Sequence, residues 1–455
     1  MASGNAHYDS RDNCNAVIEK ATNTLVFACS KTIIPKTVAK IGYAAFAGST
    51  QLESIAIPSS VNTIADYAFY GCENLEHIIV PSSVVYIGDN AFDDTEWYYY
   101  QPAGVVYINK VLYGYKGDMP DNHFVVVKEG TVSISPTAFS SQSSLTHITI
   151  PNSVTHIGYR AFEYCENLTS VILPNRLKNI EYRTFYGCED MQSLTIPQSV
   201  KTMGFDAFEG CDIDQLHYTG DIASWCGIDF GHSSSNPITA SGNLYIKNKL
   251  VTDLVIPSSV DSISAYAFVN NDALTSVTIP TSVKRIGAYA FDGCSNLTQT
   301  IYQGDIAGWC TMYFANESAN PINYSNNLYL GDQLLTDLLV PQSVTKVSDY
   351  AFIGCLSLTS VTLPPSIKHI GEYAFYACSN LASTHYAGDI ASWCAIEFAS
   401  ISSNPVALSK NLFINGVELS DLVIPDQVQK VNNYAFTNCL SLRSVTVPSS
   451  VKEIG

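Results

Sequence analysis

Long apolar runs are missing from this 455-residue chain, and so are several motifs that carry chemistry. No stretch of about 18 apolar residues occurs, which argues against a membrane-spanning helix. Phosphate-binding loops of the G-x-x-x-x-G-K-[ST] type and Cys-x₂-Cys metal ligands are also absent. Only 14% of the residues are charged, and acidic residues outnumber basic ones by 41 to 23. Because an acidic surface repels phosphate groups, nucleic acid and bare membrane are poor partners.

Internal repetition is what the chain has instead. Proline recurs at intervals of 23 residues, as at Pro35, Pro58 and Pro81. A phenylalanine follows 11 residues after the proline position in almost every unit. These phenylalanines are Phe46, Phe69, Phe92, Phe139, Phe162, Phe185, Phe208, Phe268, Phe291, Phe352, Phe375 and Phe436.

The unit at Leu274–Cys294 illustrates the physical role of each part. Apolar residues that alternate with Thr and Ser predict a short strand with one buried face, which Pro280 should end. Gly287 permits a sharp corner. Phe291 is expected on a single helical or 3₁₀ turn, filling the interior of the coil. Because one such coil cannot bury its own apolar side, neighbouring coils must stack, and the sequence predicts a repeat solenoid with a parallel sheet on one face.

A longer period is superimposed on the short one. The segment Gly220–Cys226 returns 84 residues later at Gly304–Cys310 and again at Gly388–Cys394. Each 84-residue block therefore holds two 23-residue coils and a 38-residue insert with a Trp-Cys pair. We expect an N-terminal cap at 1–34, repeats at 35–103, a hairpin insert at 104–127, repeats at 128–216, and three such blocks at 217–455, the last one truncated.

The repeat resembles the BspA-type leucine-rich repeats of bacterial and protist surface proteins. The pattern I-P-x-S-V-x-x-I-G-x-x-A-F-x-G-C is nearly intact at Ile57–Cys72, Ile279–Cys294 and Leu363–Cys378. The resemblance implies a right-handed leucine-rich-repeat coil, a secreted or cell-surface location, and a binding role such as adhesion to host or matrix protein. It transfers no catalytic residue. Ser140-Ser141 and Asn270-Asn271 depart from the Gly-Cys of the pattern, which puts regular stacking in doubt there.

The repeats also test for catalysis, because a catalytic residue is usually needed once whereas a structural one recurs with every coil. Eight of the thirteen cysteines end the Phe turn, which favours a ladder of buried thiols. Cys226, Cys310 and Cys394 either bridge to a repeat cysteine or are buried beside their tryptophans, and we favour burial. Cys14 and Cys29 either pair within the cap or stay free. The eight repeat cysteines are Cys72, Cys165, Cys188, Cys211, Cys294, Cys355, Cys378 and Cys439.

The histidines and the insert aspartates likewise favour a structural role over catalysis or metal binding. His217 and His385 each precede an insert cysteine by nine residues, but Ile301 stands at that place in the middle copy. We therefore interpret the histidines as exposed strand residues. The insert aspartates are interpreted as turn residues rather than as calcium ligands, because no dense run of Asp and Asn surrounds them. These aspartates are Asp221, Asp305 and Asp389.

Aromatic residues leave one question open. Tyrosines before the Ala-Phe pair, such as Tyr266 and Tyr289, are expected to stack along the turn side. The cluster of Trp97, Tyr98, Tyr99 and Tyr100 occurs once. It serves either to pack the third coil against the hairpin insert or to recognise a ligand, since aromatic residues are enriched at binding hot spots.

We therefore predict no enzyme, no cofactor and no metal site, but a recognition module that binds host or matrix protein. A carbohydrate-binding or spacer module of a larger surface protein is the alternative. The expected ligand face is the row of outward strand positions, where small polar side chains favour a broad and shallow contact. This row is Ser54, His77, His147, Ser170, Ser193, Gln215, Ser276, Ser360 and Ser444.

The two ends carry a separate expectation. Met1–Gly4 has no basic stretch followed by an apolar core, so no signal peptide is read there. Val451–Gly455 stops partway through a repeat. Because an open final coil exposes an apolar edge, we expect either a fragment or a second chain that covers Val445–Ile454.

Overall fold

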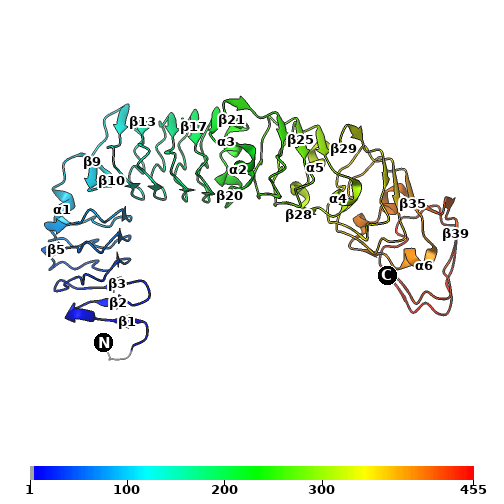
Figure 1. The fold of residues 1–455 in the computed structure, drawn as a ribbon, viewed down its shortest axis with the longest axis horizontal. Coiled ribbons are helices and arrows are strands. Elements are labelled where there is room, and N and C mark those ends of the chain that lie inside the picture. The colour runs from blue at the N-terminus through cyan, green and yellow to red at the C-terminus, as the bar shows by residue number, and fades with distance from the viewer. Residues whose placement is uncertain (1–4) are drawn as a thin grey trace. The chain divides into compact units, whose positions relative to one another are not determined.

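The computed structural model describes residues 5–455, which form two compact units (Figure 1). Unit 1 runs to Thr219 and includes Ser234–Ser241. Unit 2 comprises Gly220–Ser233 and Gly242–Gly455. Each is a solenoid in which most coils contribute two short strands, and equivalent strands of neighbouring coils pair in parallel within each sheet.

Unit 1 begins with an antiparallel meander of β1 (Tyr8–Asp9), β2 (Val17–Glu19) and β3 (Thr24–Phe27), and β3 then pairs in parallel with the first coil. The antiparallel hairpin of β9 (Gly104–Ile108) and β10 (Val111–Lys116) interrupts the coils. The outer-face strands of the coils are β5 (Ser54–Ala56), β7 (His77–Ile79), β11 (His123–Val126), β13 (Leu145–Thr149), β15 (Ser170–Ile172), β17 (Ser193–Ile196) and β19 (Gln215–Tyr218). The second strands are β4 (Lys40–Ile41), β6 (Thr63–Ile64), β8 (Tyr86–Ile87), β12 (Ser133–Ile134), β14 (His156–Ile157), β16 (Asn179–Ile180) and β18 (Thr202–Met203).

Unit 2 repeats one sheet at intervals of 84 residues. The first copy has the parallel strands β23 (Asp253–Val255), β25 (Ser276–Ile279), β27 (Gln299–Tyr302) and β29 (Leu328–Leu330), with β30 (Gln333–Leu334) antiparallel at its edge. The second copy has β31 (Asp337–Leu339), β33 (Ser360–Leu363), β35 (Ser383–Tyr386), β37 (Leu412–Ile414) and β38 (Val417–Glu418). The last pair is β39 (Asp421–Val423) and β41 (Ser444–Thr446). The inserts carry the helices α2 (Ile222–Cys226), α4 (Ile306–Cys310), α5 (Ile322–Ser325), α6 (Ile390–Cys394) and α7 (Val406–Ser409).

Strand register follows the 23-residue period. Ser170 lies opposite Ser193 and Val171 opposite Leu194, and β17 ends at Ile196 directly before a proline as predicted. The phenylalanines stack through the interior, with Phe69 and Phe92 centroids 5.3 Å apart and nearly parallel. Every repeat phenylalanine except the partly buried Phe436 is buried, and within each run of successive coils the stacked rings form the core.

The Phe turns differ from the expected helical or 3₁₀ turns. They are non-helical turns, and the residue before the Ala-Phe pair has a positive φ, as Tyr289 does at 58°. A left-handed residue at that place cannot continue a right-handed helical turn. The corner glycine also has a specific reason: a Cβ on Gly287 would lie 2.3 Å from the Ala265 nitrogen of the preceding coil.

Candidate functional site: the outer strand face

The predicted polar row is divided among separate ladders within each unit. In unit 1, Ser54 lies opposite His77. A second ladder there runs from His147 through Ser170 and Ser193 to Gln215. These side chains are exposed or half-buried, so the alternation predicted from the sequence places them on the solvent side of the strands.

In unit 2 the predicted serines pair with aspartates that the sequence reasoning missed. The Ser276 hydroxyl donates to Asp253 Oδ1 at 2.8 Å, and its counterparts Ser360 and Ser444 donate to Asp337 and Asp421 at 2.6 and 2.5 Å. The serine hydroxyl bonds lower the pKa of all three carboxyl groups, which are exposed. A negative charge is therefore held on β23, β31 and β39, the first strand of each parallel sheet on this face of unit 2, and the 84-residue repetition of Asp was the signal that could have found it.

A row of exposed apolar side chains lies two residues further along the strands. Val255, Leu339 and Val423 occupy it in unit 2, with exposed fractions of 57%, 67% and 57%. Ile79, Val126 and Ile172 occupy it in unit 1 and are exposed as well. The sequence reasoning named only the first outward position of each strand. Alternation also assigns the second outward position to solvent, and its apolar residues could have been found in that way.

Aromatic rings extend the outer strand face in the second copy of the unit 2 sheet. His385 stacks on Phe413 of the neighbouring strand, with centroids 4.7 Å apart, and its Nε2 lies 3.1 Å from the Ser383 hydroxyl. Cys394, by contrast, is fully buried. The structure thus places His385 on the strand face, as we interpreted it, and the cysteine in the core. In unit 1 His217 follows Gln215 on the strand face, and its Nε2 lies 3.4 Å from the Gln215 Oε1.

The Trp-Cys inserts are built into the core. The Trp309 and Trp393 side chains are fully buried, and their indole N–H groups donate to Ala351 and Ala435 carbonyls at 2.7 and 2.9 Å. Asp305 caps helix α4 by accepting the Gly308 N–H at 2.8 Å. The other insert aspartates cap their helices in the same way, and hydrogen bonds from Ser224 and Ser392 lower the pKa of Asp221 and Asp389. The insert carboxylates thus have a structural role as helix N-caps.

All thirteen cysteines are free thiols. In six coils the thiol donates to the Phe carbonyl of the preceding coil, as Cys294 does to Phe268 at 3.1 Å. Burial raises the pKa of Cys294 and of Cys310 to about 12. Cys14 is buried and Cys29 is exposed, and they are not bonded to each other. Thiols whose ionised form is so disfavoured are packing groups rather than nucleophiles.

The aromatic cluster at 97–100 divides into two parts. Helix α1 (Glu96–Tyr99) turns Trp97 toward Phe92 and Tyr98 toward Tyr113, with centroids 5.3 and 5.5 Å apart. Tyr99 and Tyr100 instead face solvent, with exposed fractions of 74% and 66%. Packing therefore explains the first two residues, whereas it does not explain the last two.

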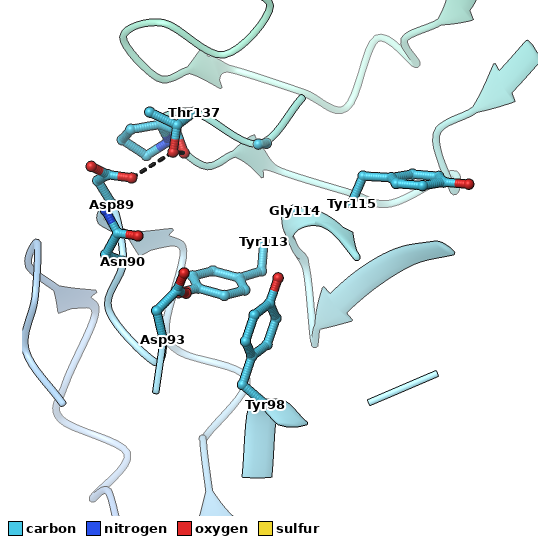
Figure 2. A pocket seen from close by; sticks show the side chains of 10 residues that line it. Asp89, Asn90, Asp93, Tyr98, Tyr113, Gly114, Tyr115 and Thr137 are labelled. Carbon is cyan, nitrogen blue, oxygen red and sulfur yellow. Dashed lines mark hydrogen bonds between the residues drawn. The ribbon is translucent and has the colours of Figure 1, made fainter. Parts of the chain in front are cut away.

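A small cavity of about 160 Å³ lies beside the hairpin and is lined by Tyr98, Tyr113 and Asp93 among others (Figure 2). Asp93 accepts the Tyr113 hydroxyl at 2.7 Å, and Asp89 accepts the Thr137 hydroxyl at 2.5 Å. Burial raises the pKa of both carboxyl groups. These bonds join the coil before the hairpin to the hairpin and to the coil after it, so the cavity lies at a structural junction.

Metal sites and membrane-spanning helices are two further classes of feature. Residues 5–455 contain no group of three or more His, Cys, Asp or Glu side chains placed to hold a metal ion. Across the same residues, no helix has the length and apolar character needed to cross a membrane.

The match to a family model decides the classification. The model of the BspA type leucine rich repeat region matches in six copies, over residues 24–110, 120–235, 241–334 and 327–455. The chain belongs to the BspA-type leucine-rich repeat family. No curated protein matches it.

Solved structures similar to this chain come from several bacteria. A leucine-rich repeat protein from Bacteroides ovatus is 22% identical, and the match covers 88% of this chain and 98% of that one, with a TM-score of 0.34. A leucine rich cell surface protein from Faecalibacterium prausnitzii is also 22% identical, covering 87% and 97%, with a TM-score of 0.31. The pneumococcal vaccine antigen PcpA is 16% identical, covering 92% and 79%, with a TM-score of 0.27.

Proposed function

We propose that this BspA-type chain is a non-catalytic recognition module, secreted or at a cell surface, that binds host or matrix protein through its outer strand face. The observation that carries the proposal is the row of exposed apolar side chains at Val255, Leu339 and Val423. Exposed apolar groups beside polar ones mark protein interaction sites on soluble proteins. The naming of one similar structure as a cell surface protein supports the proposed location.

The composition of the face favours a protein partner. Each apolar side chain in unit 2 follows an exposed aspartate two residues earlier, so Asp337 and Leu339 lie on the same face of β31. Apolar contacts would supply affinity, and the carboxylates would set which partner is accepted. No cofactor and no metal take part in this proposal.

The test introduces charged side chains at two positions of the exposed apolar row. Leu339→Glu combined with Val255→Glu should abolish capture of the chain by an immobilised panel of matrix proteins, measured by surface plasmon resonance. Leu440→Glu is the matched control, because Leu440 is exposed but lies in a turn outside the strands. Undiminished capture of the double variant would place the binding face elsewhere.

A glycan array probes the alternative in parallel. Binding to glycans without binding to any matrix protein would replace the protein-recognition proposal with the carbohydrate-binding one. Substrate turnover that disappears on mutating one non-repeated residue would contradict the non-catalytic assignment.

A further inference from the structure

An open concavity of about 420 Å³ is lined by residues of α1 and of the segments before it. It lies beside the aromatic cluster at 97–100, which the repeats do not copy. Recurrence marks architecture in this protein, so a concavity beside a cluster that does not recur is a candidate for a specific role. Its lining residues are Glu73, Asn74, Asp94, Thr95, Glu96, Tyr99 and Tyr100.

The walls of this cleft are held rigidly. Thr95 caps α1 by accepting the Tyr98 N–H at 3.1 Å and donates its hydroxyl to the Phe92 carbonyl at 2.6 Å. The Lys116 ammonium of the hairpin donates to the carbonyls of Tyr98, Tyr99 and Gln101. These bonds anchor the backbone around Tyr99, so presenting its ring to solvent requires no rearrangement.

The carboxylates of the cleft form no direct ion pair within the described part of the chain. Glu73, Asp94 and Glu96 take part in none of the ion pairs formed among residues 5–455. The Lys116 ammonium donates its N–H groups to backbone carbonyls rather than to these carboxylates. The charge of Glu96, together with a hydrogen bond between its carboxylate and the Tyr100 hydroxyl, raises the pKa of Tyr100.

The Tyr99 ring already accepts a cation on one side. The Lys116 ammonium lies 5.6 Å from its centroid, a distance within the range of a cation–π interaction. The same chemistry recurs elsewhere in the chain, where the Arg183 guanidinium lies 4.5 Å from the Tyr186 centroid. Because Tyr99 remains 74% exposed, a further cation can reach it from solvent.

We propose that this cleft binds a guanidinium or ammonium group. The cation contacts the Tyr99 and Tyr100 rings and is neutralised by Glu96, Asp94 and Glu73. A guanidinium suits the site best, because it stacks on aromatic faces and donates two parallel hydrogen bonds to one carboxylate. Its source is either an arginine or lysine side chain of a partner protein or a free polyamine. The cleft is separate from the strand face and is tested without any ligand of that face.

The experiment measures binding of small probes to the whole chain by saturation-transfer NMR at low salt. The probes are the peptide acetyl-Gly-Arg-Gly-amide, the same peptide with neutral citrulline for arginine, and spermidine. Tyr99→Ala and Glu96→Gln should each weaken binding of the arginine peptide by about two- to fivefold, and the double variant by more. Tyr43→Ala is the control, because Tyr43 is an exposed tyrosine of unit 1 outside the cleft.

The outcomes separate the alternatives. Binding of the arginine peptide, loss with citrulline and weakening by added salt support a side chain as the source. Spermidine binding that depends on Tyr99 and Glu96, without peptide binding, supports a free polyamine. Equal binding of the citrulline peptide, or equal weakening by Tyr43→Ala, overturns the proposal. So does binding of a neutral oligosaccharide that is lost in Tyr99→Ala but unchanged in Glu96→Gln. Unchanged thermal unfolding of the variants establishes that they are folded.

Discussion

Trp309 donates its indole N–H to the backbone carbonyl of Ala351, which lies 42 residues further along the chain, at 2.7 Å. The tryptophan belongs to an insert and the alanine to the first Phe turn after that insert. Asn320 of the same insert donates to the same carbonyl at 3.1 Å. These two bonds tie the insert to the pair of coils that follows it.

Replacement of this tryptophan should therefore weaken the junction. Trp309→Phe should lower the free energy of unfolding by about 1–2 kcal/mol, because a buried hydrogen bond and part of the packing are lost. Trp309→Ala should cost about 3–5 kcal/mol. Urea unfolding followed by circular dichroism measures both. The matched control is Tyr313→Phe, since Tyr313 is half-exposed on β28 (Tyr313–Phe314), and a comparable loss there would contradict the assignment.

Asn271 is expected to be a weak point of the array. It is fully buried, neither polar atom of its amide has a hydrogen-bond partner, and the sister copies have Cys355 and Cys439 at this position. A buried amide without partners costs about 1–3 kcal/mol, so Asn271→Cys should raise the unfolding midpoint in urea. The reverse change, Cys355→Asn, should lower it. A lower midpoint for Asn271→Cys would show that the amide is satisfied in solution.

The rate of thiol labelling should distinguish the buried cysteines of the coils from Cys29 of the N-terminal cap. Cys29 is exposed, Cys211 is partly buried and the other cysteines are buried. A thiol reagent at pH 8 should therefore react quickly with Cys29, slowly with Cys211, and with the remaining thiols only after unfolding. In Cys29→Ser the fast phase should vanish. Several fast thiols in the wild-type protein would disprove the buried ladder.

Alkaline pH should destabilise the solenoid. The folded chain keeps the thiols of Cys294 and Cys310 protonated up to a pKa of about 12, whereas in the unfolded chain they ionise near their usual pKa of 9.0. Their contribution to stability is thus fully present below pH 9 and is lost as pH rises toward 12. Each thiol contributes at most about 1.4 kcal/mol per pH unit. Urea midpoints between pH 8 and 11 measure this decline.

The control for this pH dependence removes the two titrating groups. A Cys294→Ala, Cys310→Ala variant should be less stable at neutral pH but should lose less stability between pH 9 and 11. Parallel curves for the variant and the wild type would mean that other groups cause the alkaline loss.

The coil itself was predictable because its constraints are local. Phe291 and Pro280 recur at a fixed spacing, and a parallel stack of equal coils turns that spacing directly into strand register. The non-helical geometry of the Phe turns was harder to predict from the sequence. Tyr289 is an unusual residue for a positive φ, and its stacking on Tyr266, with centroids 5.4 Å apart, accompanies that backbone conformation. The sequence around Tyr289 does not indicate this backbone conformation.

The candidate sites show the same division. Period and alternation by themselves determined the solenoid, the buried phenylalanines and the solvent side of Ser276. Only tertiary structure decided that Asp253 pairs with that serine, that Trp97 packs inward, and that Tyr99 beside it faces an acidic cleft. The physical reason is that the repeat specifies only contacts between neighbouring coils. Repetition specifies contacts between equivalent residues of neighbouring coils, whereas the cleft depends on a hairpin and a helix that occur once and whose positions the repeat does not encode.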